Sequence, residues 1–145
     1  MTSPHPIGRC VSALTVVVVC GGLLMAFGCN SKVSDCNKVI DVVNAHANDG
    51  DALKFDNADD WEAAAKLFDK AATDIKAVAV KDDQVKSKAA AIADTDAKAA
   101  AAFRDVGKTA KGGDPEGAAK GQKSLEEIKT SRAKAIDDFE TYCKS

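Results

Sequence analysis

Residues 59–111 carry the pattern that most limits how this chain can fold. Apolar residues return there every three or four positions, which is the spacing of one face of an α-helix. The same spacing fits one continuous heptad seam. This periodicity predicts an all-α fold. The seam comprises Trp61, Ala64, Ala65, Phe68, Ala71, Ala72, Ile75, Val78, Asp82, Val85, Ala89, Ile92, Asp96, Ala99, Phe103, Val106 and Ala110.

Whether this seam is one helix or two decides the architecture. As one helix it would run for about fifty residues, which is unusually long for a small domain. Lys81, Asp82 and Asp83 instead indicate a tight reversal in which an Asp caps a third helix. Asp82 favours the break, because an unpaired carboxylate on the seam would be buried at a cost. We therefore predict a four-helix bundle and retain the alternative of three helices with one long helix over 59–111.

A first helix is expected over about residues 35–46. Ser34 is the predicted N-cap, because its hydroxyl can accept a hydrogen bond from a free amide of the first turn. Asn-Asp-Gly-Asp at 48–51 ends the helix, and Leu53 and Phe55 in the following connection are expected to tuck under the bundle. The apolar stripe of this helix is Cys36, Val39, Ile40, Val43 and Ala47.

Start and stop residues mark the later helices. Asp59 and Glu62 form a variant of the capping box at the start of the second helix. The third helix is rich in the best helix former, since nine of the fourteen residues over 89–102 are alanine. Gly-Gly at 112–113 ends it, and Asp-Pro at 114–115 starts the last helix. The stripe of that helix is Leu125, Ile128, Arg132, Ala135, Ile136, Phe139, Tyr142 and Cys143.

The N-terminal segment has the composition of an export signal. Arg9 is the only charged side chain before Lys32, and an uncharged, mostly apolar run over 11–28 follows it. The run ends in Ala26-Phe27-Gly28-Cys29. Here the chain resembles the bacterial lipoproteins, whose signals end in a lipobox: an aliphatic or small residue, a variable residue, Gly or Ala, and then Cys.

This resemblance covers about the first thirty residues and implies a lipid anchor. It implies removal of residues 1–28, a diacylglyceryl thioether on Cys29 and a further fatty acyl chain, such as palmitate, on the new amine. The alternative is an uncleaved anchor, because residues 10–29 are long enough, at roughly 20 residues, to span a bilayer. Both readings place 30–145 outside the cytoplasm, since the positive charge precedes the apolar run. We therefore expect a membrane-anchored protein of the cell envelope, on the periplasmic face or the cell surface.

The remaining chain is one small domain. Removal of residues 1–28 would leave 117 of the 145 residues (145 minus 28). We expect a polar tether over 29–34 and an alanine-rich helical bundle over 35–145. This part carries 19 Lys and Arg (20 less Arg9) against 22 Asp and Glu, a net charge of −3. Charges of both signs are mixed along it, which speaks against a nucleic-acid-binding stripe.

The cysteines bear on the helix count. Cys10 and Cys20 would leave with the signal and Cys29 would carry lipid, so Cys36 and Cys143 remain as a pair in a compartment that permits disulfides. They mark the start of the first helix and the end of the last, which lie side by side only in the four-helix arrangement. A bond between them would close a loop of about a hundred residues and contribute roughly 4–5 kcal/mol. The alternative is two free buried thiols.

Residues capable of chemistry are few. His46, the only histidine after residue 28, lacks the second His or Cys that a transition-metal site needs, so we interpret it as a helix-end residue near exposed carbonyls. Asp49, Asp51 and Asp56 form a weak candidate for a cation site, although their spacing fails the EF-hand pattern. The sequence has no haem-attachment motif, nucleophile–base arrangement or phosphate loop. It therefore predicts no cofactor and no enzyme.

The function predicted from these observations is non-enzymatic. We expect a lipid-anchored envelope protein that presents a helical bundle to an envelope protein or a cell-wall partner. The alternative is a carrier of a small ligand or cation, which would use a cavity left by the alanine-rich core or the acidic loop. Trp61, whose spacing to Phe68 is a core spacing, is expected to plug the end of the bundle. The membrane is an expected partner through the lipid, and nucleic acid is not.

Overall fold

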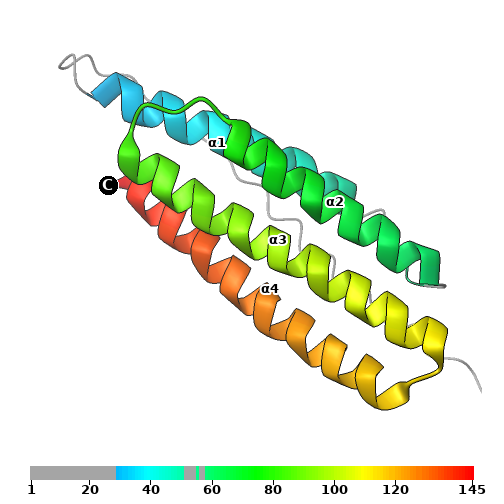
Figure 1. The fold of residues 1–145 in the computed structure, drawn as a ribbon. Helices are drawn as coiled ribbons and strands as arrows, with labels where there is room; N and C mark the ends of the chain where they lie inside the picture. The colour runs from blue at the N-terminus through cyan, green and yellow to red at the C-terminus, as the bar shows by residue number, and fades with distance from the viewer. Residues whose placement is uncertain (1–28, 51–54, 56–57) are drawn as a thin grey trace, which may run out of the picture.

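The protein is an antiparallel four-helix bundle. A computed structural model describes residues 29–50, 55 and 58–145 of the chain. Its helices are α1 (Cys29–Gly50), α2 (Ala58–Ala77), α3 (Asp83–Gly112) and α4 (Pro115–Lys144), and the described residues contain no strand. The helices alternate in direction, so the start of α1 and the end of α4 lie at the same end of the molecule (Figure 1). The predicted all-α fold with four helices is confirmed.

The break between α2 and α3 falls where the sequence placed it. Helix α2 ends at Ala77, and Asp82 takes an extended conformation (φ −77°, ψ 119°) as the N-cap of α3. Its Oδ1 accepts from the backbone amides of Gln84 and Val85, at 2.9 Å each. These amides belong to the first turn, where no helical carbonyl can reach them. The alternative of one helix over 59–111 is therefore wrong.

The turn between α3 and α4 also follows the predicted residues. Gly113 has a positive φ of 65°, the left-handed conformation that ends many helices and that suits glycine. Asp114 caps α4 by accepting from the Gly117 amide, and Pro115 takes the first helical position. Further along, Gly121 lets α4 lie close to α3, because a methyl group there would sit 2.5 Å from Cγ2 of Val106.

Three helix boundaries differ from the prediction. Helix α1 begins at Cys29, so the stretch expected to be a tether is helical and Ser34 lies inside the helix instead of capping it. The helix also continues past His46 to Gly50. Helix α2 begins at Ala58, which places Asp59 within the first turn, where its charge favours the positive end of the helix dipole.

Alanine is the commonest core residue, with nine of the sixteen buried apolar residues in the described part of the chain. The helices pack as a series, with extensive contacts of α2 on α3 and of α3 on α4, and α1 packs chiefly on α2. Within the described part of the chain, α2 and α4 do not contact each other directly. Alanine permits close helix approach but buries little apolar area per residue. The main cluster comprises Cys36, Val39, Ala72, Ile75, Val85, Ala89, Ile92, Ala93 and Phe139.

Candidate functional site

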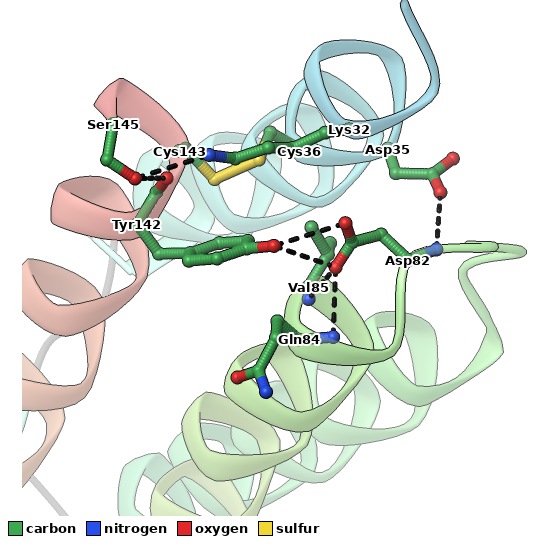
Figure 2. The surroundings of a disulfide bond; sticks show 9 residues. All are labelled: Lys32, Asp35, Cys36, Asp82, Gln84, Val85, Tyr142, Cys143 and Ser145. Carbon is green, nitrogen blue, oxygen red and sulfur yellow. Dashed lines mark hydrogen bonds between the residues drawn. A yellow bond between two sulfur atoms is a disulfide. The ribbon is translucent and has the colours of Figure 1, made fainter. Parts of the chain in front are cut away.

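The end of the bundle where α1 starts is closed by covalent and polar links (Figure 2). Cys36 of α1 and Cys143 of α4 form the predicted disulfide, with their Cα atoms 6.0 Å apart. Lys32 donates from Nζ to Ser145 Oγ at 3.2 Å and lies 4.2 Å from the centre of the Tyr142 ring. The first and last helices are thus joined at this end, which we call the disulfide end.

Asp35 fixes α1 to the connection between α2 and α3. Its carboxylate is almost fully buried and accepts from the backbone amides of Lys81 and Asp82, at 2.5 and 3.0 Å, and from Lys38 Nζ at 2.9 Å. The Lys38 hydrogen bond, followed by the two amides, lowers the pKa of Asp35 from 3.8 to about 2. The carboxylate thus provides hydrogen-bond acceptors for two backbone amides that follow α2 and have no helical partner.

Tyr142 connects α4 to the cap of α3. Its hydroxyl donates to the Asp82 carboxylate, with both oxygens 3.1 Å away (Figure 2). Burial and then this contact raise the pKa of Tyr142, because the ionised phenol would face a carboxylate. The pKa of Asp82 is lowered in turn, chiefly by the Val85 amide and then by Tyr142 and the Gln84 amide. One carboxylate therefore serves two helices.

Four polar side chains, one from each helix, form two pairs in which one member, His46 or Asp96, is buried and the other, Asp74 or Arg132, is partly exposed. His46 of α1 is buried, with Nε2 2.9 Å from Asp74 Oδ2 on α2. Asp96 of α3 is fully buried, and Arg132 of α4 donates to its Oδ1 from Nε at 2.5 Å. The sequence indicated a helix-end residue near exposed carbonyls, and His46 does lie about one turn before the end of α1, but its partner is Asp74 and not a carbonyl. It is buried because the helix continues beyond it and turns that face toward α2.

Asp96 is held in an environment that opposes its charge. Burial raises the pKa of its carboxyl, and the hydrogen bond and charge of Arg132, helped by the nearby His46, only partly offset that effect. Within the part of the chain that the structure describes, Asp96 Oδ2 and His46 Nδ1 have no hydrogen-bond partner. The buried carboxylate thus depends on a single ion pair with Arg132, which itself is partly exposed.

A groove lies between α2, α3 and α4 in the half of the bundle away from the disulfide. Its volume is about 720 Å³, within the range of small-molecule sites. The lining residues are Phe55, Trp61, Phe68, Ala99, Phe103, Ala119, Gln122, Lys123, Leu125, Glu126, Ile128, Lys129 and Arg132. The groove exists because α2 and α4 do not meet there, and the gap between them over α3 is left open. We call it the aromatic groove.

Aromatic side chains dominate its floor. The lining includes four of the seven aromatic residues in the chain (five Phe, one Trp and one Tyr). The Phe103 ring of α3 lies 5.2 Å from Phe68, 5.8 Å from Phe55 and 6.1 Å from Trp61, measured between ring centres. Phe55 is 44 % exposed although it contacts two other rings. Large apolar side chains are thus only half covered, which is typical of a binding surface.

The α4 side of the groove is basic. Lys123, Lys129 and Arg132 line it together with one acidic residue, Glu126, which lies 3.7 Å from Lys129. Arg132 uses Nε for Asp96, and within the described residues its two terminal nitrogens have no hydrogen-bond partner. The groove therefore combines an apolar floor with a guanidinium group that has free donors.

The sequence-predicted site residues are distributed over the molecule. Cys29 is the first residue of α1, and Asp49, near the end of α1, has an exposed side chain with Oδ2 4.0 Å from His46 Nδ1. The other two members of the weak cation candidate, Asp51 and Asp56, and Leu53 lie outside the described residues. Within the described residues no group of three His, Cys, Asp or Glu side chains is placed to hold a metal ion. Trp61 is half-buried and lines the groove, so it only partly plugs the bundle end.

Neither the Asp96–Arg132 pair nor the groove was predicted from the sequence. A signal for the pair was present, because each residue interrupts an otherwise apolar stripe on its own helix. Two opposite charges on facing stripes indicate a buried ion pair, since an isolated charge there would be costly. No sequence pattern indicates the groove, because it depends on the absence of contact between α2 and α4.

Two further observations bear on function. No helix among the described residues is long and apolar enough to cross a membrane. Comparison with known proteins found no matching family model, no matching curated protein and no matching solved structure.

Proposed function

We propose that this protein is a non-enzymatic binding protein of the cell envelope, anchored by lipid on Cys29, whose aromatic groove takes up a small, largely apolar ligand. The observation that carries the proposal is the groove itself, a space of about 720 Å³ floored by four aromatic rings. Of the two functions predicted from the sequence, this observation favours the small-ligand carrier. It does so because a concave site of this size suits a small molecule better than a broad protein surface.

The position of the groove supports the same function. Cys29 and the disulfide lie at one end of the bundle, and the groove residues Phe55 and Trp61 belong to the other, where α2 begins (Figure 1). Helix α3 has 30 residues, so the two ends are about 45 Å apart. A lipid on Cys29 would hold the disulfide end at the bilayer and leave the groove facing away from it.

Binding is tested with a neutral apolar dye, N-phenyl-1-naphthylamine, and the full chain in phosphatidylcholine nanodiscs. Trp61 is the only tryptophan, so energy transfer from it reports dye in the groove. We expect saturable transfer that Phe55→Ala weakens. The matched control is Val33→Ala, at the disulfide end, which alters the other large apolar side chain that is exposed among the described residues. Transfer that does not saturate, or that both variants weaken equally, contradicts binding in the groove.

The anchor is tested separately by the intact mass of the detergent-extracted protein. The proposal expects loss of residues 1–28 and added acyl mass on Cys29. Retention of residues 1–28 without acyl mass would contradict the lipid anchor and leave the groove as an independent question. A Cys29→Ser variant should lose the added mass while its Cys36–Cys143 bond is unchanged.

A further inference from the structure

We infer that the ligand of the aromatic groove is a free long-chain carboxylate, whose head binds the terminal nitrogens of Arg132 and whose alkyl chain lies on the aromatic floor. This inference rests on the proposed binding function and adds the chemical class of the ligand. Three features of the groove carry it: the orientation of Arg132, the shape of the apolar floor and the net charge of the lining.

Arg132 is oriented for a ligand by the residue behind it. Asp96 is fully buried and engages Nε of Arg132 at 2.5 Å, which fixes one edge of the guanidinium plane. The two terminal nitrogens have no hydrogen-bond partner among the described residues, and a carboxylate matches such a fork of donors with two parallel hydrogen bonds. A guanidinium already held in place loses less side-chain freedom when it binds, which favours recognition.

The apolar floor continues from this point in one direction. Helix α4 runs toward the disulfide end, so Arg132 lies nearer the middle of the bundle than Ile128 and Leu125, which also line the groove. Phe103 and Trp61 carry the floor on toward the start of α2. An extended alkyl chain starting at Arg132 would follow this line and cover rings that are otherwise half exposed.

The charge of the site matches a single negative head group. The lining carries three basic side chains, Lys123, Lys129 and Arg132, against one acidic side chain, Glu126, and Arg132 is also paired with Asp96 behind it. An anionic head group complements this excess of basic side chains. A cationic amphiphile with the same chain would face three basic side chains, so its binding is disfavoured.

The test uses the full chain in phosphatidylcholine nanodiscs and 9,10-dibromostearate as the probe. Bromine quenches tryptophan on contact, so Trp61 reports a chain that lies in the groove. We expect saturable quenching, reversed by stearate and at least about tenfold less effectively by stearylamine, a difference of about 1.4 kcal/mol. Nanodiscs made with brominated phosphatidylcholine measure any quenching from the bilayer itself.

The competitors distinguish carboxylate from other amphiphiles. Displacement by stearylamine as strong as that by stearate would overturn the assignment of the head group. Tighter binding of lysophosphatidylglycerol than of stearate would overturn the choice of a carboxylate in favour of a phosphate. If N-phenyl-1-naphthylamine binds and stearate does not, the inference fails alone. If neither binds, the proposed function fails with it.

Variants assign the contacts. Arg132→Lys keeps the charge but loses the fork, so we expect about tenfold weaker stearate binding. Should that variant not fold, Lys123→Gln with Lys129→Gln leaves the buried pair intact and is expected to weaken stearate binding about threefold at low salt. Lys134→Gln, an exposed lysine of the same helix outside the groove, is the control. Unchanged stearate binding in both groove variants overturns the inference.

Discussion

The disulfide end and the aromatic groove are built in opposite ways. At the disulfide end, Cys36–Cys143, Asp35 and Tyr142 join all four helices or their connections through one covalent and several polar links. At the groove, α2 and α4 are not in contact, and the side chains between them are large, apolar and half exposed. Polar residues fix geometry where the bundle is closed, and aromatic residues supply contact area where it is open.

The difference shows how an alanine-rich core can leave room for a site. Alanine lets α3 lie close to its neighbours but buries little apolar area per residue. The disulfide and the polar contacts at one end add stability that packing at the other end does not have to provide. The Asp96–Arg132 pair stands at the boundary between the two regions. Stability and binding are therefore expected to respond to different substitutions.

The largest expected effect is the loss of the disulfide. The bond spans 107 residues, and the double variant Cys36→Ala with Cys143→Ala should lower the free energy of unfolding by roughly 4–5 kcal/mol. Chemical denaturation of the full chain in nanodiscs measures it, with reduction of the wild type as the control. An unchanged unfolding midpoint would mean that packing and the polar links hold the closed end without help from the disulfide.

Breaking the buried ion pair comes next. Arg132→Gln leaves the Asp96 carboxylate buried without a partner and should cost roughly 3 kcal/mol in unfolding free energy. Arg132→Gln combined with Asp96→Asn removes the uncompensated charge and should recover most of that loss, as a double-mutant cycle will show. A double variant as unstable as the single one would indicate that the pair acts through its packing.

Asp35 makes the disulfide end sensitive to acid. Its folded pKa of about 2 lies below the ordinary 3.8, so its contribution to stability is complete above 3.8 and is lost as pH falls toward 2. Asp35→Asn should therefore be less stable than the wild type at neutral pH, and the two should converge near pH 2. Thermal unfolding by circular dichroism across this range measures the difference. Parallel curves at all pH values would contradict the role given to Asp35.

Tyr142 provides a smaller and more local readout. It is the only tyrosine, so the ultraviolet absorbance of its phenolate titrates alone. Burial and Asp82 should place its pKa above the ordinary 10.0, and Asp82→Asn should lower it only in part, because burial remains. The stability gained from this contact is fully present below the ordinary pKa of 10.0, and it is lost as the pH rises through the higher pKa of the folded protein. An ordinary pKa in the wild type would show that the contact is not formed.

The smallest effect on stability is expected at the groove. Phe55 is exposed enough that Phe55→Ala should change the unfolding free energy by no more than about 0.5 kcal/mol. The same variant should weaken dye binding, which Cys36→Ala with Cys143→Ala should affect less. A groove variant that unfolds the protein, or one that leaves dye binding intact, would contradict the claim that one region provides stability and the other provides binding.

Much of the fold could be predicted from local chemistry. Asp82 indicated a helix start because a carboxylate on an apolar seam is costly to bury without hydrogen-bond donors. The amides of Gln84 and Val85 are those donors. Gly113 and Asp114 marked a stop and a start by the same kind of argument. The spacing of Cys36 and Cys143 along alternating helices then favoured the closed end that the structure shows.

The candidate site could not be predicted in this way, because it depends on contacts between helices. Phe55 lies in a connection without periodicity, and nothing local joins it to Phe103. His46 pairs with Asp74 across two helices, a partner that no pattern within α1 reveals. Arg132 and Asp96 are each a charged residue on an otherwise apolar stripe, and the contact between them explains why both are there.

The disulfide also determines how mechanical load passes through the molecule. A pull at Cys29 enters α1, reaches Cys36 within two turns and crosses directly to Cys143 at the end of α4. The part of α1 after Cys36 lies off this path, as do α2 and α3. Tension between the first residue of α1 and the last turn of α4 therefore passes through one covalent bond. The rings that form the groove do not bear this load.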